Sequence, residues 1–242
     1  IQARPGLIAR ARRADLLVCT GAGLEEGWLP VLLARANNPR IRPGASGYLE
    51  TSTAVSLLET RVDVDRSAGH VHPQGNPHIQ LDPGNIPAIA TAVSGRLVEI
   101  DSQNASSYEQ RLDDFLNRWR HAMARWEARA TDLKGMRIVV HHNAWVYLVR
   151  WLGLDQSGTL EEKPGIPPTS GHLSRLLDRL KAQPVSAIVR SSIQSDRASR
   201  WLSERTGIRA IELPTTVGGS DAATDLFSLF DDILERLLAA RS

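Results

Sequence analysis

The sequence predicts an α/β protein in which two lobes, each a parallel sheet flanked by helices, are joined by one long rigid backbone helix. Short apolar runs alternate with helical segments in both halves of the chain, as expected for parallel strands with crossover helices. One uninterrupted amphipathic segment lies near the midpoint of the chain. The length of 242 residues suits one large domain or two domains of ordinary size.

The amino-terminal part begins with a helix and a strand. Residues 5–14 open with a proline suited to a first helical turn, and residues 15–19 are a short apolar strand. We expect a helix over 24–36, a loop with a short strand over 37–53, and a helix over 85–101. Residues 67–84 are rich in Gly, Pro and His, so this stretch is expected to be irregular and partly exposed.

The long helix is predicted from a repeat of apolar residues. Steps of four and three alternate, which places these residues on one face of a helix of about 28 residues, roughly 42 Å long. The residues are Leu112, Leu116, Trp119, Met123, Trp126, Ala130 and Leu133. A core or coiled-coil helix could show the same stripe, but the length and central position favour a spine between two lobes. The predicted division is therefore 1–104, a linking helix over 105–133, and 134–242.

The second half of the chain repeats the alternation of strands and helices. Apolar strands are predicted at residues 137–140, 185–189 and 210–213. Helices are predicted at 143–152, 169–182, 195–206 and 221–240. This order indicates a second parallel sheet.

Composition excludes several classes of protein. The 42% hydrophobic and 23% charged fractions are those of a globular domain, and no apolar run reaches the ~20 residues of a membrane helix. The net charge of +2 gives no electrostatic reason to expect nucleic acid. The one cysteine, Cys19, cannot form an internal disulfide, and its apolar neighbours indicate a small buried hydrophobic residue.

Five of the seven histidines fall in two clusters, one on each side of the predicted long helix. His70, His72 and His78 form the first, and the pair His141 and His142 forms the second. Imidazole is the commonest protein ligand for zinc and similar metals. His78, flanked by prolines, is the stronger candidate in the first cluster. The other two could be secondary ligands, a mobile metal-capturing loop or exposed residues.

The second histidine pair follows an apolar strand, and ligands of open parallel sheets bind beyond the carboxyl ends of the strands. Because adjacent strand residues face opposite ways, either His141 or His142 could point into such a crevice. The alternative is that one histidine is packed and the other is in solvent. Two carboxylates, Asp221 and Asp225, lie near the start of the last predicted helix. Capping of that helix is the expected role of Asp221, whereas Asp225 is expected one helical turn later, facing the cleft.

Nucleotide and hydrolase motifs are missing from the sequence. The chain has no P-loop, no Gly-x-Ser-x-Gly elbow and no His-Glu-x-x-His motif. Glu161 and Glu162 lie in a proline-rich segment. They could supply a general base, although a structured surface loop is the simpler interpretation.

Three segments together resemble one known family. They are residues 14–25 (ADLLVCTGAGLE), 76–83 (NPHIQLDP) and 140–148 (VHHNAWVYL). The chain resembles the metal-binding periplasmic solute receptors of ABC importers, the zinc/manganese group called cluster A-I. The resemblance extends through almost the whole chain and implies two α/β lobes joined by a long rigid helix.

The resemblance also implies a ligand set. His78, His142 and Asp225 match the positions of metal ligands, and His70, His72, His141 and Asp221 are possible secondary contacts. The first ligand of the family, usually a histidine, has no counterpart, and residues 1–13 resemble the helix that follows it. We therefore expect that this sequence begins after the first strand of the amino-terminal lobe, which leaves that lobe truncated and the metal site incomplete.

The expected function is transport rather than catalysis. A divalent transition metal, with Zn²⁺ favoured and Mn²⁺ possible, would bind between the lobes of a monomeric periplasmic protein and pass to an ABC membrane permease. One alternative is a zinc-dependent hydrolase that uses the same histidines with Glu161 or Glu162 as base. Another is a metal-free adhesin-like protein on the same scaffold.

Overall fold

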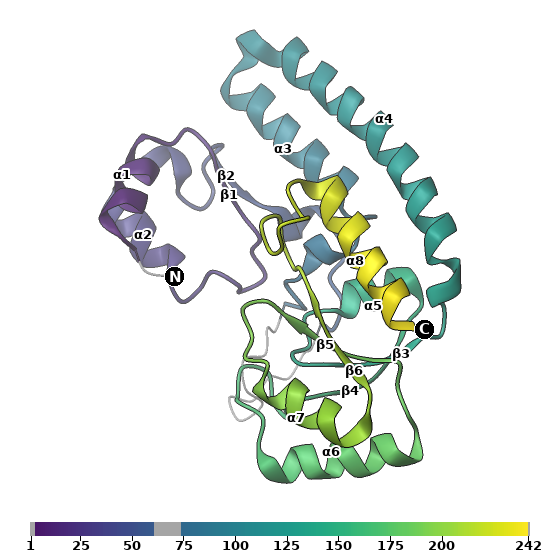
Figure 1. Ribbon diagram of the computed structural model, residues 1–242. Coiled ribbons are helices and arrows are strands. Elements are labelled where there is room, and N and C mark those ends of the chain that lie inside the picture. The colour runs from purple at the N-terminus through teal and green to yellow at the C-terminus, as the bar shows by residue number, and fades with distance from the viewer. Residues whose placement is uncertain (1–2, 61–73, 242) are drawn as a thin grey trace. The chain divides into compact units, whose positions relative to one another are not determined.

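The computed structural model describes residues 3–60 and 74–241. These residues divide into two compact units (Figure 1). The first unit contains residues 3–60, 74–79 and 85–118, and the second contains residues 80–84 and 119–241. His70 and His72 lie outside the described residues.

Helices and parallel strands alternate along the chain, which confirms the predicted α/β class. The helices are α1 (Pro5–Arg13), α2 (Leu29–Ala36), α3 (Ile86–Ile100), α4 (Ala105–Ala130), α5 (Val146–Leu152), α6 (Ser170–Ala182), α7 (Arg197–Thr206) and α8 (Leu226–Arg241). The strands are β1 (Leu17–Cys19), β2 (Tyr48–Glu50), β3 (Arg137–Val140), β4 (Asp155–Thr159), β5 (Ala187–Ser191) and β6 (Arg209–Leu213).

The first unit is built around two short strands. β1 and β2 pair in parallel, with Leu17 opposite Tyr48 and Cys19 opposite Glu50. Apolar side chains of α1 and α2 pack with Cys19 and Ile41 into one buried cluster. Cys19 is a free, buried thiol, so the prediction of a small buried hydrophobic residue is confirmed.

The second unit contains a four-stranded parallel sheet in the order β4-β3-β5-β6. Figure 1 shows α6 and α7 on one face of this sheet and α5 and α8 on the other. The chain leaves β3 for β4 on one side, whereas β5 pairs with β3 on the other side. The carboxyl end of β3 is therefore at a topological switch point, where open α/β sheets bind ligands.

The long helix is confirmed as α4, and the apolar stripe predicted from the sequence is buried in its second half. Trp119 and Trp126 are buried, with exposed fractions of 1% and 0%. Their rings lie edge to face with centroids 5.1 Å apart, and both contact Phe230 of α8 at 5.8 Å and 5.2 Å. Such aromatic contacts stabilise the second unit beyond the burial of area alone.

Three elements differ from the prediction: α2, which begins at Leu29 rather than at residue 24, β4 and the last helix. β4 was not predicted, because its sequence DQSGT has no apolar side chain and the strand lies at the edge of the sheet. The last helix begins at Leu226 rather than at residue 221. Its amino-terminal cap is Asp225, whose Oδ1 accepts a hydrogen bond from the Ser228 backbone N–H at 2.7 Å. The capping role expected for Asp221 was therefore wrong.

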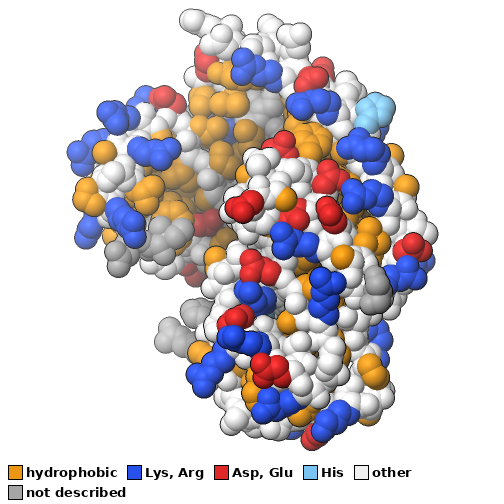
Figure 2. All heavy atoms as spheres, viewed as in Figure 1, with side chains coloured by type: hydrophobic (Ala, Val, Ile, Leu, Met, Phe, Trp, Pro, Cys, Tyr) orange, Lys and Arg blue, Asp and Glu red, His pale blue; other side chains and the backbone are white. Residues whose placement is uncertain are grey.

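Charged side chains of both signs are interspersed on the visible face of the second unit (Figure 2). Within the described ranges, no helix combines the length and the apolar character needed to cross a membrane.

Candidate metal centre

His78 lies in the first unit, in a turn fixed by the side chain of Asn76. The Asn76 Oδ1 atom accepts hydrogen bonds from the His78 backbone N–H at 3.1 Å and from the ring Nδ1 at 2.8 Å. The Asn76 Nδ2 group donates to Glu59 at 3.1 Å, which sets the orientation of the amide. In its neutral form the His78 ring therefore carries its proton on Nδ1, which places the lone pair on Nε2.

The backbone before His78 is held by contacts with the segment around Leu58. The Asn76 N–H donates to the Leu58 carbonyl oxygen at 2.7 Å. Gly75 has a φ of +128°, and a Cβ at this position would lie 2.8 Å from that same oxygen. Only glycine fits this conformation and this close approach. The sequence Gly-Asn-Pro-His therefore builds the turn that orients the His78 imidazole.

His142 lies in the second unit, just beyond the carboxyl end of β3, and its ring is paired with Glu161. The distance between His142 Nδ1 and Glu161 Oε2 is 2.7 Å. A carboxylate can only accept, so Nδ1 donates and the lone pair of the neutral ring is on Nε2. The His142 side chain is 23% exposed. This geometry suits a ring that binds a metal ion through Nε2.

His141 differs from its neighbour in burial and in bonding. Its residue exposure is 6%, and its Nε2 lies 3.8 Å from Glu161 Oε1, which is too long for a hydrogen bond. Burial lowers the pKa of His141, while the nearby Glu161 charge opposes that shift. His141 is thus the packed member of the pair and His142 the partly exposed one.

The two candidate carboxylates are both exposed. Asp225 forms a reciprocal cap with Ser228, whose hydroxyl oxygen accepts from the Asp225 backbone N–H at 2.9 Å. The expectation that Asp225 lies one turn inside the last helix is therefore wrong, although its carboxylate remains at the helix end. Asp221 lies in the loop before it.

The three predicted ligands are divided between the units, with His78 in the first and His142 and Asp225 in the second. Within residues 3–60 and 74–241, no group of three or more His, Cys, Asp and Glu side chains is placed so that it could hold a metal ion. The side chains that the structure does bring together are His141, His142 and Glu161.

The role of Glu161 was not predicted from the sequence. It was assigned to a surface loop, but its side chain is only 12% exposed. Recognition of β4 would have placed Glu161 beyond a strand end next to His142. A pocket of about 670 Å³ lies beside Glu161 and His141, lined further by α6 and α7 residues such as Leu173 and Trp201.

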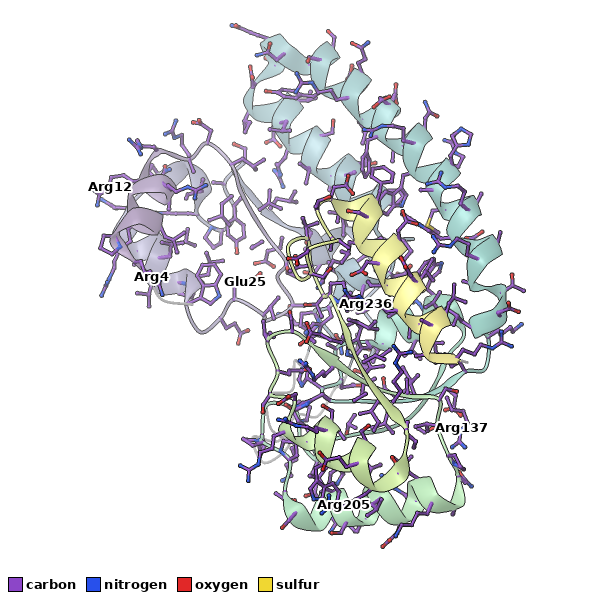
Figure 3. All side chains as sticks on the ribbon, viewed as in Figure 1. Arg4, Arg12, Glu25, Arg137, Arg205 and Arg236 are labelled. Atoms are coloured by element: carbon purple, nitrogen blue, oxygen red, sulfur yellow. The ribbon has the colours of Figure 1, made fainter. Side chains whose placement is uncertain are left out.

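In the first unit, a carboxylate closes the loop after β1. The Glu25 side chain, labelled in Figure 3, accepts hydrogen bonds from the backbone N–H groups of Thr20 and Gly21 at 2.9 Å and 3.0 Å. These contacts satisfy two backbone donors at the carboxyl end of the strand. Glu25 is thus a structural residue of the segment that carried the family resemblance.

The sequence profile of one family matches nearly the whole chain. The matching family is described as "ZnuA: Zinc-uptake complex component A periplasmic", and the match covers residues 1–240. The chain belongs to this family. The resemblance inferred from the sequence is confirmed at the level of the ZnuA family.

Two curated relatives show moderate similarity to this member of the ZnuA family. The high-affinity zinc uptake system protein ZnuA of Yersinia pestis is 26% identical over 196 residues, which is 73% of this chain and 59% of that protein. The manganese-binding lipoprotein MntA of Halalkalibacterium halodurans is 26% identical over 182 residues, covering 72% and 53% respectively. The matched region thus spans a little over half the length of each relative.

Solved structures share the fold. A crystal structure of ZnuA superposes with a TM-score of 0.78 at 22% identity, covering 99% of this chain and 84% of that one. A Mn-bound periplasmic metal binding protein from candidatus Liberibacter asiaticus gives a TM-score of 0.77 at 15% identity, covering 100% and 86%. These similarities confirm the α/β architecture of the ZnuA family for this chain.

Proposed function

We propose that this chain captures a divalent transition metal ion in the periplasm, as a monomer, and delivers it to an ABC permease. His78 from the first unit and His142 and Asp225 from the second supply ligands. His70, His72, His141 and Asp221 remain candidates for secondary contacts only. Membership of a family named for zinc uptake supports this proposal.

One observation carries the proposal. Each of the two predicted histidine ligands donates from Nδ1 to an oxygen atom that is itself held in place, Asn76 Oδ1 for His78 and Glu161 Oε2 for His142. Metal-binding histidines almost always have their second ring nitrogen bonded in this way, because the bond fixes the tautomer and the ring orientation. Both rings are therefore prepared to bind through Nε2.

The donor set favours zinc as the transported ion. Two imidazoles and one carboxylate suit Zn²⁺, with metal–ligand distances of about 2.0–2.2 Å. Mn²⁺ prefers a larger share of oxygen ligands. Because one curated relative is named for zinc uptake and another for manganese binding, Mn²⁺ is the competitor to include in any titration.

The hydrolase alternative is disfavoured by the environment of the two candidate bases. Glu161 accepts from His142 and from the Gly165 N–H at 2.8 Å. Glu162 is exposed and pairs with Arg175 at 2.7 Å. Both carboxylates are thus already engaged in contacts with other residues of the chain, and the family is named for an uptake component rather than an enzyme.

A competition titration tests the proposal. Zinc affinity is measured with a chromophoric chelator for the native chain and for His78→Ala, His142→Ala and Asp225→Asn. Loss of a direct ligand is expected to weaken zinc binding by at least about 100-fold for each histidine, more than typical changes to outer-shell partners. His121→Ala, on the exposed side of α4, is the matched control. Equal affinity in the control and in both histidine variants would overturn the ligand assignment, and an adhesin-like protein would then be favoured.

A further inference from the structure

Backbone hydrogen bonds fix the position of Glu161 beside His142. The Glu161 N–H donates to the His141 carbonyl oxygen at 3.0 Å, and the Leu160 N–H donates to Val140 at 2.8 Å. These bonds continue the pairing of β3 and β4 beyond the strand ends. The position of Glu161 relative to His142 is therefore set by the register of the sheet.

The side chain of Glu161 is restrained as well. Its Oε2 atom accepts from His142 Nδ1 at 2.7 Å and from the Gly165 N–H at 2.8 Å. Its exposed fraction of 12% leaves little room for other rotamers. Two donors converge on one oxygen, so the carboxylate is preorganised as an acceptor for the His142 ring.

We infer that Glu161 is a positioning residue that sets the tautomer of His142 and raises its strength as a metal ligand through Nε2. This inference rests on the proposed function only for the metal, because the tautomer is a property of the protein alone. A carboxylate behind a ligating imidazole increases the basicity of the nitrogen that faces the metal. Without that acceptor the ring is free to protonate Nε2 instead, and that tautomer cannot bind metal through Nε2.

His78 provides an internal comparison. Its Nδ1 proton is accepted by the neutral amide oxygen of Asn76 at 2.8 Å, whereas that of His142 is accepted by a carboxylate. Charge-assisted hydrogen bonds are roughly twice as strong as neutral ones. The two predicted ligands are therefore unequal, and the Nε2 atom of His142 is the stronger metal ligand of the two.

Two substitutions of Glu161 separate the effect of its hydrogen bond to His142 from the effect of its charge. In Glu161→Gln, a single amide oxygen can still accept from both His142 and Gly165, so the hydrogen bond remains while the charge is lost. In Glu161→Ala, both are lost. The matched control is Glu162→Ala, which removes the neighbouring carboxylate, an exposed one that pairs with Arg175.

The first readout is the His142 tautomer in the metal-free protein, measured by long-range ¹H–¹⁵N NMR and assigned by the missing signal in His142→Ala. The native chain and Glu161→Gln are expected to show the Nδ1–H form, and Glu161→Ala a shift towards the Nε2–H form. Retention of the Nδ1–H form in Glu161→Ala would overturn the inference. Should Glu161→Ala fail to fold, the Nε2–H form in Glu161→Gln or in the native chain would overturn it equally.

The second readout is zinc affinity, measured by chelator competition. Glu161→Ala is expected to weaken binding by about 10–100-fold, Glu161→Gln by less, and Glu162→Ala not at all. A loss in Glu161→Gln as large as in His142→Ala, with the tautomer unchanged, would make Glu161 a direct ligand and overturn the inference. Unchanged affinity in His142→Ala would instead overturn the proposed function, while the NMR result stands by itself.

Discussion

The ring nitrogen Nδ1 of His142 lies 2.7 Å from the carboxylate oxygen Oε2 of Glu161. The two residues are 19 positions apart in the chain and are brought together because β3 and β4 are parallel neighbours. Asn76 and His78 form the corresponding pair in the first unit, at 2.8 Å. Several properties of the protein follow from these pairs and from the elements that carry them.

The two roles of Asp225 can be separated by substitution. Asn is as good a helix cap as Asp, so Asp225→Asn should leave the free energy of unfolding within about 0.5 kcal/mol of the native value while weakening zinc binding. Asp225→Ala should also lose about 0.5–2 kcal/mol of stability. Urea unfolding and chelator competition measure the two effects. Asp178→Asn, at an exposed aspartate of α6, is the control, and native zinc affinity in Asp225→Asn would show that this carboxylate acts only as a cap.

Substitution of Gly75 should damage the His78 turn. In Gly75→Ala, a positive φ and close contacts with Leu57 and Leu58 should cost about 1–3 kcal/mol of local strain, and the displaced Asn76 should hold His78 less well. Zinc affinity is therefore expected to fall. Gly44→Ala is the matched control, since Gly44 also has a positive φ but no atom near its Cβ position. Equal zinc affinity in the two variants would show that the turn does not orient the ligand.

Cys19 should make the first unit sensitive to alkaline pH. Burial raises the pKa of the Cys19 thiol from 9.0 to about 11. Between these values the unfolded chain releases its proton while the folded chain keeps it, so this contribution to stability is present below pH 9 and is lost as pH rises towards 11. Urea unfolding at pH 8.5 and 10.5 should show a larger loss for the native chain than for Cys19→Ala. Equal losses in both proteins would contradict this account of the thiol.

Strong periodicity made much of the fold predictable. The apolar stripe of α4 and the apolar runs of β3 and β5 gave these elements with nearly correct bounds, because their side chains are buried in the positions that the pattern implies. The environment of Cys19 was predicted for the same reason. A helix or strand can be predicted from the sequence alone when the residues of its apolar pattern are the ones that are buried.

The parts that were missed depend on contacts between distant residues. β4 has no apolar pattern and owes its extended form to pairing with β3, so Glu161 could not be placed beside His142. Likewise, Asp221 was the expected cap, and only the reciprocal bonds with Ser228 identify Asp225 as the cap instead. Side-chain pairs of this kind are properties of the tertiary structure.

The position of zinc in zinc-soaked crystals of this protein tests the central claim, binding through Nε2 of His78 and His142, most directly. An anomalous difference map at the zinc absorption edge is expected to show one strong peak about 2.0–2.1 Å from Nε2 of both His78 and His142, with Nδ1 of each ring still bonded to Asn76 and Glu161. A zinc peak bound through Nδ1 of either ring, or one that touches neither histidine, would contradict the account.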